Sequence, residues 1–122
     1  VPPLPPEPLV ISSPNRNFRW RVTGLDVERT SDGGDVWRKQ NVALARTVVA
    51  GTAPSAAVCW LVGQAGSVFL AVGSEWKDVS MTRKVDLVKV AAIDSMNATV
   101  TASDGTLFST SDAGVTWTAL TQ

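Results

Sequence analysis

The sequence contains no histidine and no tyrosine, and it has a single cysteine. Without histidine the chain cannot hold a Ser-His-Asp or Cys-His nucleophile system or a histidine-ligated metal ion. Cys59 has no partner for an internal disulfide, and it lies in the apolar stretch AAVCWLV. That setting predicts a buried, unreactive thiol. The commonest nucleophile systems and metal centres are therefore excluded by composition alone.

The chain also lacks an excess of charge of either sign, because eleven basic residues balance eleven acidic ones. A nucleic acid or an anionic membrane surface requires clustered positive charge, so we expect neither as a partner. No apolar run approaches the ~20 residues that span a bilayer, and we expect no membrane insertion of this segment. The chain begins without Met and without a signal pattern, so we expect it to be a segment of a longer precursor.

The composition predicts one globular domain preceded by a linker. Hydrophobic residues make up 44% of the chain and charged residues 18%, which is ordinary for a domain with a core. Five of the seven prolines lie in VPPLPPEP at the start, a pattern that favours extended polyproline II. We predict a Pro-rich linker over residues 1–9 and a domain over 10–122. From the linker we expect an extracytoplasmic domain, periplasmic or secreted, attached to an N-terminal part; a ligand for a proline-recognition domain is the alternative.

The pattern of the remaining residues is typical of an all-β protein. Short runs rich in Val, Thr, Trp, Phe and Leu are separated by Gly, Asp, Asn and Ser. The best helical candidate is RKVDLVKVAA, residues 83–92, and its alternation suits a strand as well.

One motif occurs twice in the chain. TSDGGDVW at residues 30–37 returns as TSDAGVTW at residues 110–117, so that Trp37 and Trp117 are 80 positions apart. Trp76 falls near the midpoint, in GSEW, where the loop is shorter and its Asp is missing. The chain therefore has three repeats of about 40 residues.

A second column of residues supports the same period. RWRVTG and CWLVGQ place Trp20 and Trp60 forty residues apart, and the third copy, NATVTA, is expected to place Ala98 and Val100 in the Trp and Val columns. A repeat of about 40 residues with four short strands predicts a β-propeller blade, and we place three blades at about residues 10–41, 42–81 and 82–122. The predicted repeat core consists of Trp20, Val22, Trp60, Val62, Trp76 and Val100.

The repeated motif matches the Asp-box, (S/T)-x-D-x-G-x-x-W, also called the bacterial neuraminidase repeat. The stretch CWLVGQAGSVFLAV further resembles blades of the photosystem II stability/assembly factor family of propellers. This resemblance covers roughly residues 10–122. It implies a non-catalytic module that presents its surface to a protein partner.

Each Asp-box is expected to hold a hairpin between the third and fourth strands of its blade. The Asp accepts backbone N–H groups of its own turn, the Thr offers a hydroxyl, the Gly takes a positive φ, and the Trp anchors the outer strand against the neighbouring sheet. The resemblance implies that these hairpins lie away from the ligand face. A calcium loop is the alternative, but the ligand series of such a loop is missing, so we expect no metal and no cofactor. The structural box residues are Thr30, Asp32, Gly34, Trp37, Thr110, Asp112, Gly114 and Trp117.

The family name invites a sialidase interpretation, which the sequence does not support. Sialidases use a Tyr nucleophile, and other glycosidases need two carboxylates that face a cleft. The candidate carboxylates fall mostly at turns: Asp26, Asp78, Asp86, Asp94 and Asp104. We predict a protein without enzymatic activity. The alternatives are a carbohydrate-binding propeller, which exposure of Trp20 or Trp60 beside a groove would favour, and a remnant of a glycoside hydrolase.

Three blades are too few to close a ring. We expect an open arc with an apolar face at each end, near Trp20 and Val22 on one side and Val115 and Trp117 on the other. Two copies related by a two-fold axis would then form a homodimer with a six-bladed ring. In the alternative, the missing blades belong to another part of the precursor or to another chain.

Overall fold

The computed structural model describes residues 9–23, 26–40, 42, 48–73, 75–81 and 84–120, so the predicted linker lies almost entirely outside the described residues. The described chain forms three four-stranded antiparallel sheets and one short 3-10 turn, η1 (Gln64–Gly66). The all-β prediction is confirmed. No helix in this part of the chain is long and apolar enough to cross a membrane.

In each sheet, strands that are consecutive in the chain lie side by side, as expected for a propeller blade. We call the sheets blades 1, 2 and 3 in chain order. Blade 1 contains β1 (Leu9–Ser12), β2 (Arg19–Thr23), β3 (Asp26–Thr30) and β4 (Arg38–Lys39). Blade 2 contains β5 (Val48–Ser55), β6 (Val58–Gly63), β7 (Val68–Val72) and β8 (Glu75–Asp78). Blade 3 contains β9 (Leu87–Ala92), β10 (Ala98–Ala102), β11 (Leu107–Thr110) and β12 (Thr118–Leu120). The segment that suited a helix or a strand therefore contains a strand, β9.

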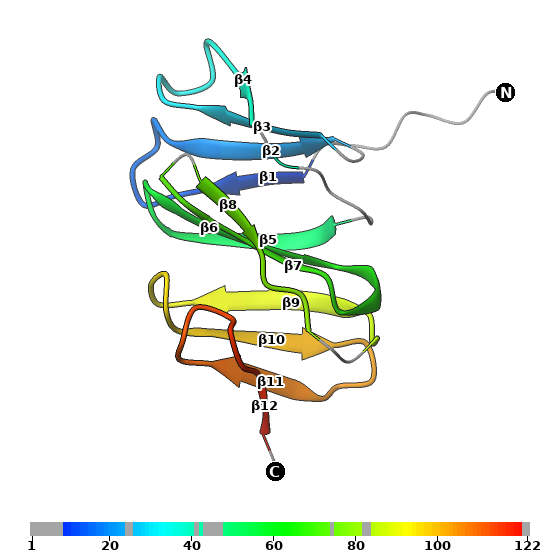
Figure 1. Cartoon of the computed structure of the whole chain (residues 1–122). Helices are drawn as coiled ribbons and strands as arrows, with labels where there is room; N and C mark the ends of the chain where they lie inside the picture. The colour runs from blue at the N-terminus through cyan, green and yellow to red at the C-terminus, as the bar shows by residue number, and fades with distance from the viewer. Residues whose placement is uncertain are drawn as a thin grey trace, which may run out of the picture.

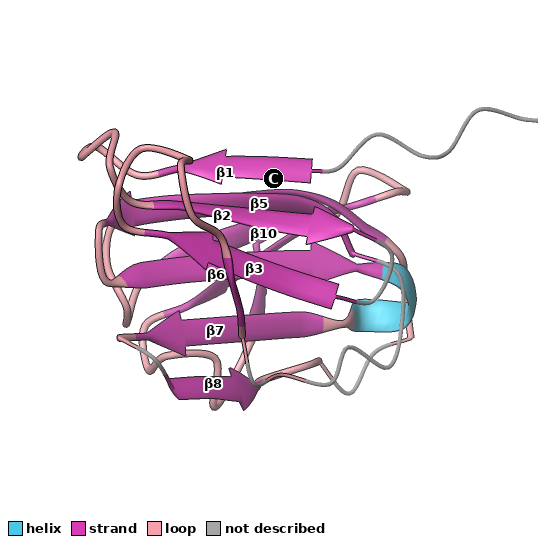
Figure 2. Ribbon diagram, turned by 90° about the horizontal axis from the view of Figure 1, so that it is seen from above, coloured by secondary structure: helices cyan, strands magenta, loops and turns pink. Residues whose placement is uncertain are grey.

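The first strands of the three blades lie next to one another in the middle of the molecule. Strand β5 contacts both β1 and β9, while the short strands β4, β8 and β12 lie at the outer ends of their sheets (Figure 1). Seen from above, blade 2 runs from β5 beside β1 to β8 on the far side (Figure 2). The blades thus form an open arc around their first strands.

Apolar side chains fill the two spaces between the blades. The core between blades 1 and 2 contains Trp20 and Val22 of blade 1 and Leu61 of blade 2. The core between blades 2 and 3 contains Trp60 of blade 2 and Val100 of blade 3. Every residue of β6 is buried, because both faces of blade 2 are covered. This explains why the stretch around β6 is continuously apolar instead of alternating.

The predicted alignment of the third repeat is wrong by one residue. Thr30 of the first box pairs with Arg19, and Thr110 of the third box pairs with Ala98. Superposing the boxes therefore puts Thr99, not Ala98, in the column of Trp20 and Trp60. Val100 belongs to the core, as predicted, but it faces the preceding blade, whereas the column it was assigned to faces the following one. Alanine and valine alternate with threonine in β10, and this pattern does not determine which of the two sets faces the preceding blade.

In the described part of the chain, most of the residues expected at apolar end faces lie between the blades instead. Trp20 and Val22 are 0% and 4% exposed because they face blade 2, and Trp117 packs against the core of blades 2 and 3. Of the four residues expected at the end faces, only Val115 is well exposed, at 78%.

Polar side chains predominate in one paired row at each end of the arc. Directly paired residues of an antiparallel sheet share one face, so the strand pairing identifies what each end presents. The outer face of blade 1 carries the paired row Val10, Arg21, Glu28 and Lys39. The outer face of blade 3 carries the paired row Ala91, Thr99, Ser109 and Thr118.

Candidate functional site

The first Asp-box closes the hairpin between β3 and β4 with a network of short hydrogen bonds. The Thr30 hydroxyl donates to Asp32 Oδ1 (2.7 Å), and the same oxygen accepts the backbone N–H of Val36 (3.0 Å). The Gly34 N–H donates to Thr30 Oγ1 (3.0 Å), with Gly34 at φ +105°. The Val36 N–H, followed by the Thr30 hydroxyl, lowers the pKa of Asp32.

The third blade repeats this network between β11 and β12. The Thr110 hydroxyl donates to Asp112 Oδ1 (2.7 Å), and the Gly114 N–H donates to Thr110 Oγ1 (2.9 Å), with Gly114 at φ +85°. Thr116 adds its hydroxyl to Asp112 Oδ2 (2.6 Å) and its N–H to Asp112 Oδ1 (2.9 Å). These donors lower the pKa of Asp112 to about 2, the Thr116 hydroxyl contributing most. Both box carboxylates are thus ionised at neutral pH and bonded to their own turns.

The tryptophan of the fourth strand ties each later blade to the blade before it. Trp117 donates its Nε1–H to the carbonyl of Val79 (3.2 Å), and its ring meets Trp60 edge to face, with centroids 6.2 Å apart. Trp76 donates in the same way to Gln40 Oε1 (3.3 Å). The box tryptophan therefore fixes the position of one blade against the next.

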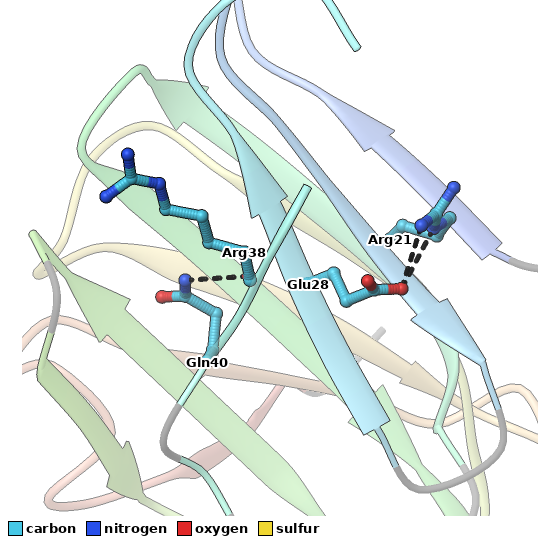
Figure 3. Close-up of polar contacts among 4 residues, drawn as sticks. All are labelled: Arg21, Glu28, Arg38 and Gln40. Carbon is cyan, nitrogen blue, oxygen red and sulfur yellow. Dashed lines mark hydrogen bonds and ion pairs between the residues drawn. The ribbon is translucent and has the colours of Figure 1, made fainter. Parts of the chain in front are cut away.

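Trp37 does not make such a contact, because the described chain has no sheet before blade 1. The guanidinium of Arg21 lies 4.3 Å from the centre of its ring instead. Within the described chain Trp37 therefore packs inside its own blade, half buried. Arg21 also forms an ion pair with Glu28 (2.9 Å), as Figure 3 shows.

The outer face of blade 1 is a charge-balanced surface with a shallow hollow of about 400 Å³. The Arg21–Glu28 pair and the more exposed pair of Lys39 with Asp26 (3.6 Å) lie on it. Ion pairs this accessible to water contribute little to stability. Of the basic residues of the first repeat, Arg21 and Lys39 thus have acidic partners on this face. The hollow is lined by Arg21, Thr23, Asp26, Glu28 and Lys39.

The outer face of blade 3 holds a second hollow, of about 410 Å³. Its walls come from all four strands of the blade and from the loop after β9. The signal in the sequence was the presence of Thr99 and Ser109 where blade 2 has Trp60 and Leu70, and the register error concealed it. The lining, which we call the blade 3 hollow, includes Ala91, Ile93, Thr99, Ser109, Thr116 and Thr118.

A third, smaller hollow of about 270 Å³ lies between blades 2 and 3, beside the third Asp-box. Its rim carries the exposed apolar side chains Val72, Met96 and Val115. Isolated exposed apolar residues are common, but three around one hollow form a surface suited to another protein.

The remaining candidate carboxylates accept hydrogen bonds from loop backbone groups or, for Asp26, form an ion pair. Asp94 accepts the N–H groups of Met96 and Asn97, both at 2.8 Å, and these bonds lower the pKa of Asp94. Asp86 accepts the N–H of Ala65 (2.9 Å). Asp78 and Asp104 likewise bond to residues two positions on, and Asp26 faces Lys39. Within the described part of the chain, no three Cys, Asp or Glu side chains gather in a group that could hold a metal ion.

Cys59 is fully buried in the core between blades 1 and 2, and this burial raises the pKa of its thiol. The thiol is protonated and inaccessible, so it offers no nucleophile.

Comparison with known proteins places the chain among propellers. The model of the family described as "Photosynthesis system II assembly factor YCF48" matches residues 14–122. No match was found among curated proteins.

Three solved structures share the fold. A structure of YCF48 bound to D1 peptide is 18% identical, with a TM-score of 0.73, and the alignment covers 90% of this chain and 39% of that one. YCF48 from Cyanidioschyzon merolae is 23% identical, with a TM-score of 0.76, over 97% and 38% of the two chains. The Niastella koreensis GH74 enzyme is 14% identical, with a TM-score of 0.60, over 90% and 17%.

At these identities the structures show the fold, and this chain spans about two fifths of the length of the YCF48 chains. The family match covers nearly the whole domain, boxes included. The chain therefore belongs to the family of the photosystem II assembly factor YCF48.

Proposed function

We propose that this domain is a non-catalytic module that binds a segment of a protein partner. The observation that carries the proposal is the solved YCF48 structure, which holds a D1 peptide on a propeller of the same family. The surfaces of the chain agree with this function, since its hollows are shallow, lie on the faces of sheets and between blades, and are lined mainly by uncharged or charge-balanced side chains.

The absence of catalysis is part of the proposal. Asp32 and Asp112 accept hydrogen bonds from their own hairpins and are held in the ionised form, so they are poor proton donors. The likeness to a GH74 enzyme concerns the fold alone, and a fold does not determine a reaction.

A protein partner is better supported than a carbohydrate. Sugar-binding propellers would need exposed aromatic rings, and Trp20 and Trp60, the two candidates, are both 0% exposed. The ring of Trp37 is half buried and lies under the Arg21 guanidinium. None of these three rings therefore offers a fully exposed face on which a sugar could stack.

A second copy of the chain is the other candidate partner. Its support is the blade count, since three blades leave a ring open. The polar rows on the two end faces speak against a tight blade-to-blade contact of the kind seen within the chain. We therefore place a different protein ahead of self-association.

We also propose that the domain is the extracytoplasmic part of a larger protein. The support is the Pro-rich stretch at residues 1–8, a composition typical of spacers between a domain and what precedes it. Fractionation of cells that express the complete precursor tests this, and recovery of the domain with the cytoplasmic fraction would contradict it.

The function can be tested by parallel selections on the purified domain. We expect a displayed library of random peptides to yield sequences that share a motif and bind with micromolar dissociation constants, unchanged by a metal chelator. A glycan array and a fluorogenic sialoside serve as the competing readouts. Binding confined to glycans, or turnover of the sialoside above background, would overturn the proposal.

A further inference from the structure

The outer strand of blade 2 has a backbone edge that no other described strand pairs with. The strand order of the blade is β5-β6-β7-β8, and β8 is the last strand of its sheet. With four residues it is the longest of the three outer strands, and Figure 2 shows it at the margin of its sheet. Blades 1 and 3 flank blade 2 within the described chain. A further blade would pack against blade 1 or blade 3, so this edge lies on the circumference of the arc and not at either of its ends.

The hydrogen bonds of β8 identify which of its backbone groups point outward. The Val79 N–H, directly after β8, donates to the carbonyl of Val68 (2.9 Å), and two positions earlier Lys77 is paired with β7 in the same phase. In an antiparallel pair such bonded residues alternate with residues whose N–H and C=O groups point the other way. Trp76 and Asp78 therefore direct their backbone groups away from the sheet. A further strand could pair with them.

An apolar hollow opens beside this edge, on the side that faces blade 3. It is the hollow of about 270 Å³ between blades 2 and 3, which we call the rim hollow. Its lining includes the buried Leu70, which is paired with Lys77, and the exposed side chains of Val72, Met96 and Val115. Successive side chains of a strand point to opposite faces of its sheet. A strand laid along β8 would therefore direct every second side chain toward the rim hollow.

Two opposite charges restrict which strand can pair with β8. Glu75 and Lys77 lie two residues apart, are exposed and line the rim hollow. Neither forms an ion pair with another residue of the described chain. Across a pair of strands, opposite charges stabilise the pairing and like charges destabilise it. The edge therefore favours a segment with an acidic residue opposite Lys77 and a basic residue opposite Glu75, and it disfavours the reverse order.

We propose that an extended segment of the partner protein adds to blade 2 as a further strand, antiparallel to β8. The inference rests on the proposed function and names its site. On the side of the rim hollow the segment presents an apolar, an acidic, a basic and an apolar residue in turn. The two charges meet Lys77 and Glu75, and the apolar residues lie beside Val79 and Val72. Backbone bonds then give affinity, and the alternate side chains give specificity.

A second copy of this chain is a poorer occupant of the same edge. On the side of the rim hollow its own β8 would bring only the charged side chains of Glu75 and Lys77. The apolar side chains around the hollow would remain uncovered.

The pairing can be tested with the peptide acetyl-Leu-Thr-Glu-Thr-Lys-Thr-Leu-amide and amide hydrogen exchange of the domain. We expect saturating peptide to slow exchange at Trp76 and Asp78 roughly tenfold, since exchange then requires release of the bound strand. Lys77 and Val79, whose amides already face β7, should change less. Unchanged exchange at Trp76 and Asp78, or protection centred on another blade, would overturn the proposal. Protection that appears without peptide when the domain is concentrated would also overturn it, because a second copy would then occupy the edge.

N-methylated peptides separate backbone pairing from side-chain contact. In the proposed register the two threonines that flank the glutamate point their N–H groups at β8, and the N–H of the glutamate points away. Methylation of those two threonine nitrogens should abolish binding, and methylation of the glutamate nitrogen is the matched control. Equal loss from both modifications, or loss from neither, would contradict the addition of a strand.

Exchange of the two charges of β8 tests the specificity. The double variant Glu75→Lys/Lys77→Glu should bind the peptide roughly tenfold more weakly, since two attractions become two repulsions. It should prefer the peptide in which glutamate and lysine are exchanged. The matched control is Asp26→Lys/Lys39→Asp, which reverses an exposed ion pair on blade 1 and keeps the net charge. Equal binding of both peptides by the wild-type domain, or equal loss in the control, would contradict the proposal.

The rim hollow is tested separately through Val115. Val115→Ser should weaken binding of the peptide about fivefold, because an apolar contact is lost. Val88→Ser, at an exposed valine of β9 that does not line the hollow, is the control. Unchanged binding in Val115→Ser, or the same loss in both variants, would show that the hollow is not part of the site.

The failure of the site and the failure of the proposed function give different results. If peptides selected by the wild-type domain bind Glu75→Lys/Lys77→Glu unchanged, the module binds protein elsewhere and the edge of β8 is not its site. If no peptide is selected while glycans bind, the protein-binding function itself fails.

Discussion

Trp20 and Trp60 occupy the same column of the repeat and are equally buried, but their indole N–H groups are not equivalent. Trp60 donates to the carbonyl of Asp94, whereas Trp20 Nε1 is buried without a hydrogen-bond partner in the described chain. The loop after β9 is longer than the tight turn after β5, and it brings a carbonyl to the indole. In the shorter turn, the carbonyl of Ala56 accepts Arg29 instead (2.9 Å).

This difference predicts unequal effects of the same substitution. Replacing either Trp with Phe leaves a cavity, but only Trp60→Phe also removes a hydrogen bond. We expect Trp60→Phe to lower the free energy of unfolding by about 1 kcal/mol more than Trp20→Phe, since that is the usual net value of one such bond. Urea unfolding of the two variants measures the difference. A larger loss in Trp20→Phe would contradict the assignment.

The two box carboxylates also differ at a single residue. Asp112 receives the hydroxyl of Thr116, and the first box has Val36 at that position, which offers only its backbone N–H to Asp32. The Thr116 hydroxyl contributes most to lowering the pKa of Asp112 to about 2. The third box should therefore keep its charge to lower pH.

Thr116→Val should raise the pKa of Asp112 toward the ordinary value of 3.8. A carboxyl whose pKa is lowered by folding adds stability above its unfolded pKa and loses it as pH falls through its folded pKa. In wild type this loss is expected between about pH 4 and pH 2, and in Thr116→Val it should be smaller and complete at higher pH. Carbon NMR titration of Asp112 and melting curves over this range measure both effects. An unmoved titration midpoint would show that the hydroxyl is not the cause.

At the scale of the element, the Asp-box hairpin closes its turn in both blades, and in blade 3 it also packs against the neighbouring blade. Both hairpins close their own turn with the same bonds. Only the third lies against another blade: a Cβ added at Gly114 would lie 2.7 Å from Val79, whereas one added at Gly34 meets nothing nearer than the Trp37 ring at 3.8 Å.

Alanine at the two box glycines separates the turn from the packing. Both positions have positive φ, so each substitution should cost about 1–2 kcal/mol of backbone strain. Gly114→Ala should cost about 1–3 kcal/mol more, because the methyl group displaces Val79 at the interface between the blades. Equal losses in thermal or urea unfolding would show that the hairpin does not position blade 3 against blade 2.

The blades and boxes could be predicted because each rests on several typed residues at a fixed spacing. Which side chains of an individual strand point toward which neighbouring blade could not be predicted. In β6 both faces are buried, and in β10 small residues alternate with threonines, so a period of two fits either phase. The blade 3 hollow was missed for the same reason, since Thr99 is recognised as a missing tryptophan only after the boxes fix the register.

At the scale of the whole molecule, the described arc is apolar between its blades and mainly polar along one paired row at each end. Leu61 and Phe69 of blade 2 face blade 1, and the corresponding positions of blade 1 are Arg21 and Glu28. At the other end, Thr99 replaces the tryptophan of the preceding blades.

The polarity of these two faces predicts how copies of this chain associate. A ring closed by two copies would bury the Arg21–Glu28 row against the threonines of blade 3, and few hydrogen bonds would then replace the water lost by these charges. We therefore expect light scattering to give the mass of one chain, 12.9 kDa, at micromolar concentration, and not twice that mass, as the homodimer would require. A stable dimer would show that the end faces do associate, and Arg21→Glu would then locate the contact. That substitution places two like charges opposite each other on blade 1 and should break a ring closed through this face, whereas Lys77→Glu, on the outer strand of blade 2, should leave it intact.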